Sequence, residues 1–170
     1  SATGSEVSKR VDATNNTYYL GVGALGAIVT SDESIIFGDG ACDLNTEVKR
    51  SVVIGTEAQG GALTDLVHND NVIIGTQAAY NSFLGNTNVI IGSEAAMNSL
   101  TPTHIDDNNV MIGYRAGKGG QGVDATIVGS FGSANGTNSL ALGSSSGANF
   151  NQSIALGSCK TDKAKQMKVG

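Results

Sequence analysis

The sequence predicts an all-β solenoid in which short parallel strands stack into about nine to ten coils. A phrase of three apolar residues closed by a glycine recurs along the chain, most clearly as Val72–Gly75 and Val89–Gly92. The chain also holds 24 glycines and 1 proline, a combination that favours many strands joined by tight turns. Recurrence of one strand-and-turn phrase is typical of a repeat fold.

The closing glycines set the period of the repeat. From residue 38 on they fall at 38, 55, 75, 92, 113, 129, 143, 157 and 170. The late steps, such as that from 143 to 157, are the shortest and define the basic unit, and the early units carry insertions. Frequent glycine and runs of β-branched residues oppose a helix. Each phrase is predicted to form a strand, and the small residues after its glycine, such as Thr56–Ala58, a second short strand.

One repeat domain over residues 18–170 is expected, preceded by a leader or N-terminal cap over the polar residues 1–17. A repeat array grows by adding units, so the chain length does not require a second domain. The chain is expected to be a fragment of a longer fibrous protein.

The insertions recur at one phase of the unit, just before the next phrase, over residues 59–70, 80–87, 98–108 and 118–124. Insertions at a fixed phase of a solenoid project from one face, which is often the binding face. They are predicted to be loops. The residues in them that we expect to contact a receptor are Leu66, His68, Asp70, Phe83, His104, Asp106 and Asp107.

The three positions of the phrase predict an inside and an outside for the coil. Positions one and three share a face of a strand, and we expect these uniformly large residues to fill the coil interior. This predicted core comprises Ile35, Phe37, Val52, Ile54, Val72, Ile74, Val89, Ile91, Val110, Ile112, Val128, Leu140, Leu142, Ile154 and Leu156. Position two then points outward as an apolar stripe of Ile36, Val53, Ile73, Ile90, Met111, Ile127, Ala141 and Ala155. A stripe this contiguous needs a cover, and a long self-complementary rod predicts association of identical chains.

Composition excludes several classes of partner. The net charge is −5 and the basic residues cluster only in the tail, which argues against nucleic-acid binding. No stretch approaches the roughly 18 apolar residues of a membrane span. Cys42 and Cys159 lie several repeats apart, and we expect both to be free thiols.

No arrangement of residues in the sequence predicts catalysis, a metal or a cofactor. The carboxylates Asp65, Asp70, Asp106 and Asp107 lie in the insertions. A pair of them across a subunit groove would suit acid and base catalysis on a polysaccharide, but we expect solvated loop side chains. The two histidines each precede an aspartate by two positions, a spacing that a metal ligand pair shares with ordinary polar loops. The glycine-rich residues 117–122 lack the Gly-Lys-Ser/Thr ending of a phosphate loop. We therefore expect a protein that is not an enzyme.

Two of the late copies, Asn138–Gly143 and Gln152–Gly157, resemble the head repeat of YadA-type trimeric autotransporter adhesins. Similar repeats occur in phage tail fibres. The likeness extends loosely over residues 34–170, where the middle position of most copies is larger than the family prefers. The resemblance implies a left-handed parallel β-roll and a homotrimer.

These observations predict a structural and attachment segment of a trimeric phage tail fibre or tailspike, located in the virion. It would act as a rigid spacer and contact a host-surface glycan or protein through its inserted loops. One alternative is the head of a bacterial trimeric adhesin at the cell surface, binding host matrix or cells. Another is a polysaccharide-degrading spike. The two thiols favour the first reading, because an exported chain passes through an oxidising periplasm.

Overall fold

The computed structural model describes residues 9–12, 16–24, 26, 30–43, 47–61, 67–97, 103–105, 107–118 and 122–170. Of residues 9–12, 30, 67–68, 83 and 103–105 it describes the backbone alone. None of these described residues is helical, and the regular structure among them is strand throughout. No helix in the described part of the chain is long and apolar enough to cross a membrane.

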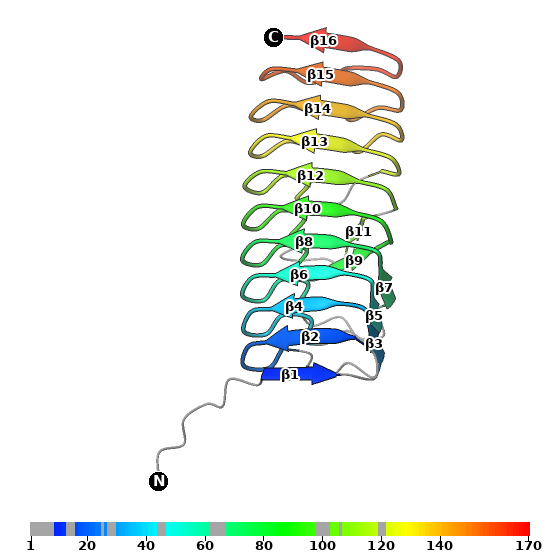
Figure 1. Ribbon diagram of the computed structural model, residues 1–170. Helices are drawn as coiled ribbons and strands as arrows, with labels where there is room; N and C mark the ends of the chain where they lie inside the picture. The colour runs from blue at the N-terminus through cyan, green and yellow to red at the C-terminus, as the bar shows by residue number, and fades with distance from the viewer. Residues whose placement is uncertain are drawn as a thin grey trace.

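One eleven-stranded sheet runs the length of the molecule, as Figure 1 shows. In sheet order its strands are β1 (Lys9–Asp12), β2 (Thr17–Leu20), β4 (Ile35–Phe37), β6 (Val52–Ile54), β8 (Val72–Ile74), β10 (Val89–Ile91), β12 (Val110–Ile112), β13 (Thr126–Val128), β14 (Leu140–Leu142), β15 (Ile154–Leu156) and β16 (Met167–Val169). From β2 to β16 every pair is parallel and in register, so that Ile73 lies beside Ile90 and Ile90 beside Met111. The prediction of an all-β parallel solenoid is confirmed, while its hand and its number of coils stay predictions.

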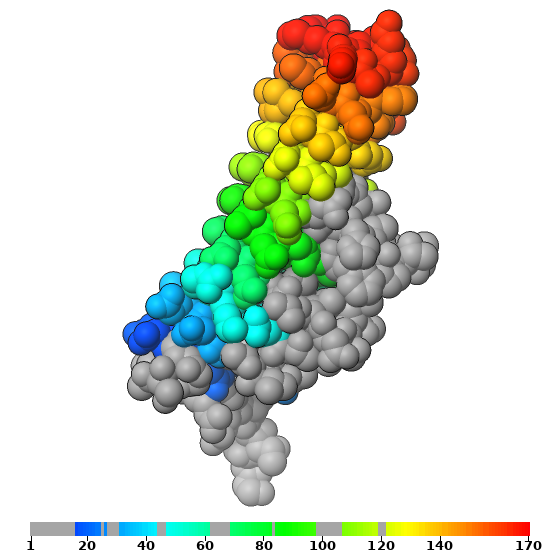
Figure 2. Space-filling view, turned by 90° about the vertical axis from the view of Figure 1, so that its right-hand side faces the viewer, coloured from blue at the N-terminus to red at the C-terminus, as the bar shows by residue number. Residues whose placement is uncertain are grey.

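The coils therefore follow one another along the rod in the order of the sequence. The described residues succeed one another in bands of colour along the long axis, with the C-terminal segment, in red, at one end (Figure 2). At the other end β1 pairs antiparallel with β2, from Lys9 beside Leu20 to Asp12 beside Thr17. This hairpin covers the first edge of the parallel sheet. The division of the chain at residue 17 stays a prediction.

The inside and the outside of the coil are the reverse of the sequence prediction. The middle residues of the phrase, expected to form an outer stripe, are all buried within the single chain at 0% exposure: Ile36, Val53, Ile73, Ile90, Met111, Ile127, Ala141 and Ala155. The residue two before each of them, such as Asn71, shares their face and is buried as well. The interior of so narrow a coil accepts one large side chain per strand, and alanines from the turns fill the rest, among them Ala58, Ala78, Ala95 and Ala116.

The predicted second strand after each glycine is a turn instead. Glu57, Gln77, Glu94 and Arg115 all have φ between 54° and 55°, which is left-handed backbone and interrupts a strand. The turn brings the following alanine into the core. At Ser133, Gly147 and Lys160, by contrast, neighbouring coils are joined by isolated parallel bridges.

The closing position of the phrase requires glycine because the backbone of the next coil lies too close for a Cβ. Gly75 has φ 141°, and a Cβ built on it would overlap the carbonyl oxygen of Gly92 in the next coil. Gly38 has φ 143° and meets Gly55 in the same way. A column of such contacts lets the coils approach to strand-pairing distance at this corner.

Two further small sheets lie beside the main one, on one side of the rod (Figure 1). β3 (Thr30–Asp32), β5 (Glu47–Lys49) and β7 (Val67–Asn69) pair in parallel, and β9 (Ser82–Leu84) pairs in parallel with β11 (Thr103–Ile105). β7, β9 and β11 lie within segments that were predicted to be loops, so that prediction is wrong for these three strands. β3 and β5 lie before the predicted insertions. These strands of successive coils lie one strand spacing apart, so that the backbone N–H and C=O groups of one can hydrogen-bond to those of the next.

Candidate functional site

The broadest feature of the surface is an apolar face on the main sheet. Positions one and three of the phrase point outward, so the set predicted as the coil core is exposed or half-buried and the prediction was wrong. We call this surface the outer apolar face; it comprises Ile35, Phe37, Val52, Ile54, Val72, Ile74, Val89, Ile91, Val110, Ile112, Val128, Leu140, Leu142, Ile154 and Leu156, with Tyr18, Leu20, Met167 and Val169 at its ends. Alternation along each strand brings all of them to one side of the sheet. The surface spans ten parallel strands and is too large to be an incidental patch.

A column of buried polar side chains behind the sheet holds these strands in register. Asn71 Oδ1 accepts a hydrogen bond from the Asn88 amide at 2.8 Å, and Asn88 Oδ1 accepts one from Asn109 at 2.8 Å. Asn109 Oδ1 in turn accepts one from the Ala125 amide. Ser34 and Ser51 serve the same purpose lower in the column. Each side chain satisfies a backbone donor of the next coil, which ties the position of one strand to its neighbour.

Two charged residues at the corners before β6 and β8 pair between neighbouring coils. Arg50 donates two hydrogen bonds to Asp70, Nε to Oδ1 at 2.6 Å and Nη2 to Oδ2 at 2.7 Å. These bonds lower the pKa of the Asp70 carboxyl and raise the pKa of the Arg50 guanidinium. Asp70 was predicted to contact a receptor, and the structure places it in this pair with both oxygens engaged.

The other predicted receptor residues are dispersed. His68 lies in β7, whereas Phe83 and His104 lie beside one another in register in β9 and β11. Asp107 accepts a hydrogen bond from the Asn86 amide at 2.6 Å. Leu66 and Asp106 lie outside the described residues. The structure therefore brings Phe83 and His104 together and separates them from His68, and a receptor role for the set stays a prediction.

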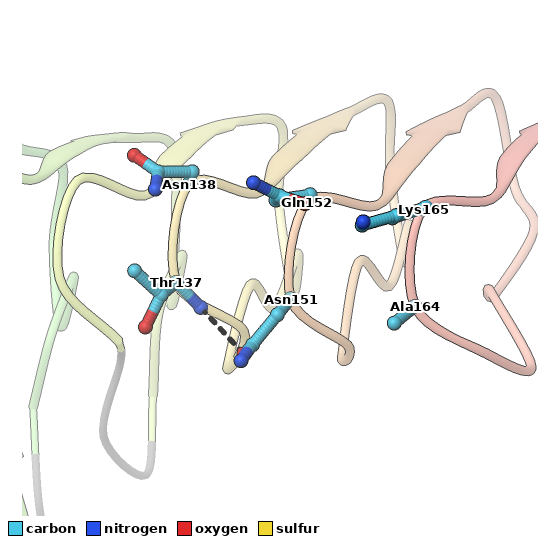
Figure 3. Close-up of a pocket in the computed structure, with 6 residues that line it drawn as sticks. All are labelled: Thr137, Asn138, Asn151, Gln152, Ala164 and Lys165. Carbon is cyan, nitrogen blue, oxygen red and sulfur yellow. Dashed lines mark hydrogen bonds between the residues drawn. The ribbon is translucent and has the colours of Figure 1, made fainter.

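A shallow depression of about 380 Å³ lies at the same corner near the C-terminal end of the rod. Asn138, Gln152 and Lys165 form a row across successive coils, and Thr137, Asn151 and Ala164 form a second row next to it (Figure 3). Asn151 Oδ1 accepts a hydrogen bond from the Thr137 amide at 3.1 Å. All six residues lie on the regular coils, where sequence reasoning placed no site.

On the opposite edge of the strands, at the turn after the glycine, aromatic and charged side chains gather. The rings of Tyr114 and Phe131 meet edge to face, with centroids 5.3 Å apart. Arg115 donates a hydrogen bond through Nε to Glu94 Oε2 at 2.6 Å, and its Cζ lies 4.9 Å from the centre of the Tyr114 ring. The Arg115 hydrogen bond is the main cause of a lowered pKa at Glu94. Sequence reasoning missed this cluster, although its signal is visible: aromatic residues stand at two turn positions where most other turns hold a polar residue, such as Ser93 and Glu94.

Neither cysteine forms a disulfide, as expected: Cys42 is a buried thiol and Cys159 a half-buried one. Among the residues that the structure describes, no three histidines, cysteines or carboxylates come together to hold a metal ion.

The geometry defines a parallel β-solenoid with a continuous apolar sheet on one outer face. Comparison with known families then places part of the chain more closely: residues 134–158 match the YadA head domain repeat in two copies. The suspected resemblance is confirmed over these residues. The comparison with curated proteins and that with solved structures each gave no significant match.

Proposed function

We propose that this chain is the rigid, non-catalytic shaft of an attachment protein of the trimeric adhesin-head type, displayed at a cell surface. The observation that carries the proposal is the outer apolar face. Nine of its residues on the main sheet are at least 36% exposed in the single chain: Tyr18, Leu20, Ile35, Phe37, Ile54, Val128, Leu142, Met167 and Val169. Full burial of such a side chain gains about 1.5–3 kcal/mol. Covering this half-exposed set contributes on the order of 10 kcal/mol per chain.

Identical chains supply the cover that this face requires. The face is a straight column of short strands in one register, so a second copy of the same column matches it along its whole length. The number three comes from the YadA head repeat at residues 134–158. Three sheets around one axis bury the face of every chain and leave the side sheets β3–β5–β7 and β9–β11 available to a partner.

Sedimentation equilibrium of the wild-type chain tests this proposal. The expected mass is about three times the 17.2 kDa of one chain, independent of concentration over the micromolar range. A single-chain mass at all concentrations would contradict it, because the outer apolar face would then be stable in water.

A phage tail fibre is the second candidate, and the two thiols favour it. Cys42 and Cys159 lie several coils apart and neither is in a disulfide, and unpaired cysteines are more typical of proteins that fold in a reducing cytoplasm than of exported ones. Immunogold electron microscopy with antibodies against the folded chain separates the candidates. Label on intact bacterial cells supports the adhesin, whereas label confined to virions supports the tail fibre.

The proposal also assigns the chain binding without catalysis. Incubation with purified bacterial polysaccharides should release no reducing ends. Release that depends on the chain would instead support a polysaccharide-degrading spike.

A further inference from the structure

The turn that follows each closing glycine has two outward positions, and two neighbouring coils fill them with aromatic residues. Tyr114 stands where most other described turns hold a hydroxyl residue, namely Thr56, Thr76, Ser93, Ser130, Ser144 and Ser158. The first two turns hold Val22 and Asp39 there. Phe131 stands one position later, where other described turns hold Gly23, Gly40, Glu57, Gln77, Glu94, Arg115 and Ser145. Serine satisfies both positions elsewhere, so the fold does not require either ring.

Both rings are presented to solvent. Tyr114 is 39% exposed and Phe131 52% exposed. They lie at an interplanar angle of 87° with their centroids 5.3 Å apart, so the two rings form two walls of a corner. An exposed aromatic pair does not gain the free energy that burial would give. Where the backbone would also accept a small polar residue, such a pair indicates a role in binding rather than in folding.

Charged groups hold the Tyr114 ring in place, and Phe131 packs against that ring. The Arg115 guanidinium lies over the Tyr114 ring, its Cζ 4.9 Å from the centroid, a cation–π geometry. Arg115 is fixed in turn by Glu94, which also accepts a hydrogen bond from the Tyr114 hydroxyl at 3.3 Å. The four side chains come from three successive coils, so the rigid solenoid sets their spacing. The cluster is thus ordered before any ligand arrives, which reduces the entropy lost on binding.

The geometry points to this cluster of Tyr114, Phe131, Arg115 and Glu94 as a binding site for a pyranose ring of a surface glycan. A pyranose has one face lined by C–H groups, which the negative face of an aromatic ring attracts, and a rim of hydroxyls. The exposed ring walls suit the first, and the carboxylate and guanidinium beside them suit the second. Arg115 and Glu94 neutralise one another, so the site does not depend on ligand charge. This inference rests on the proposed attachment function and names the ligand class for it.

The test is a glycan microarray carrying neutral and uronic-acid-containing pyranose oligosaccharides, probed with the assembled wild-type protein. The oligosaccharide that binds most strongly is then titrated calorimetrically against variants. The double variant Tyr114→Ser with Phe131→Ser installs the residue that other coils hold at these positions, including Ser145 at φ 57° beside Phe131 at φ 58°. Phe150→Ser is the matched control, because Phe150 is 40% exposed and lies outside the cluster.

We expect the double variant to lose at least tenfold in affinity and Phe150→Ser to change it less than twofold. Arg115→Gln, which introduces the residue found at Gln77, should weaken binding by an intermediate factor. An array on which the wild type binds no pyranose, or a double variant of unchanged affinity, would overturn the inference. A fall in the sedimentation mass of the double variant would also overturn it, since the rings would then be subunit contacts. Failure of the wild type to assemble would contradict the proposed function. It would not by itself contradict the inference, because glycan binding is measured separately.

Discussion

At the residue scale, each coil is positioned by a few columns of like residues, and each column has its own chemistry. Gly75 and its counterparts allow close approach, Asn71 and its counterparts satisfy backbone donors, and the residue at the corner before them is left-handed, as Asp70 is at φ 60°. The recurrence of the glycine and the asparagine was visible in the sequence. That the asparagine side chain points into the coil was not, because polar side chains usually face water.

Gly75→Ala tests the glycine column. The φ of 141° strains an L-residue by about 1–3 kcal/mol, and the overlap with the Gly92 carbonyl adds to that. We expect a large fall in the urea midpoint. Gly23→Ala is the control, since φ is 70° there but a Cβ would meet nothing within 4 Å, and its loss should be the smaller. Equal losses would show that the coil contact does not matter.

Asn88→Ala tests the asparagine column. The variant leaves the buried Asn109 amide without its acceptor at 2.8 Å, which costs about 1–3 kcal/mol. Asn88→Ser should lose less, because Ser51 performs the same role for the Asn71 amide at 3.1 Å. Chemical denaturation measures both, and an alanine variant as stable as the wild type would count against the column.

The ion pair between Arg50 and Asp70 makes the stability of the folded chain depend on pH in a predictable direction. The hydrogen bonds from Arg50 lower the pKa of Asp70 in the folded chain, so the pair stabilises at pH above the ordinary aspartate pKa and is lost as pH falls through the lowered value. Asp70→Asn should therefore be slightly less stable than the wild type at pH 7, because the pair is exposed, and the difference should vanish in strong acid. Thermal midpoints from pH 7 to pH 2 measure it. A difference that grows on acidification would contradict the assignment.

At the element scale, the positions of the main-sheet strands could be predicted from the sequence, but which side of each strand faces the coil interior could not. Recurrence of the phrase placed β6, β8 and β10 within their observed bounds, and their parallel register follows from repetition alone. The side sheets were missed because β5 and β7 carry charged or polar residues, as in Glu47–Lys49, and pair through backbone rather than side chains. A strand whose partner is another insertion leaves little apolar pattern in the sequence.

Deleting residues 62–69 tests whether the insertions are structural. This removes β7, its pairing with β5 and the hydrogen bond from the Asn69 amide to Asn86. We now expect a clear fall in the thermal midpoint. The control removes residues 119–120, which shortens the step from Gly113 to Gly129 to the length of the next step, from Gly129 to Gly143. That variant should stay near the wild type, and an equally stable 62–69 deletion would show that β7 contributes nothing.

At the scale of the whole molecule, repetition was enough to predict a rod, but not which side chains of each strand face outward. An apolar phrase such as Val72-Ile73-Ile74 is hydrophobic on both faces, so alternation cannot distinguish inside from outside. The space in the coil decides: Ile73 fills it, and Val72 and Ile74 remain outside. The candidate glycan site likewise depends on neighbouring coils bringing Tyr114 and Phe131 together, which the sequence shows only once the coil length is known.

The central claim is that the outer apolar face is the surface by which chains associate. Sedimentation equilibrium of Ile74→Asp with Ile91→Asp tests it most directly, against the matched pair Thr76→Asp with Ser93→Asp, which adds the same charge at exposed residues two positions further along each coil. The account predicts folded single chains for the first pair, with the far-ultraviolet spectrum of the wild type, and an unchanged assembly for the second. An assembly that survives charge on Ile74 and Ile91 would contradict it.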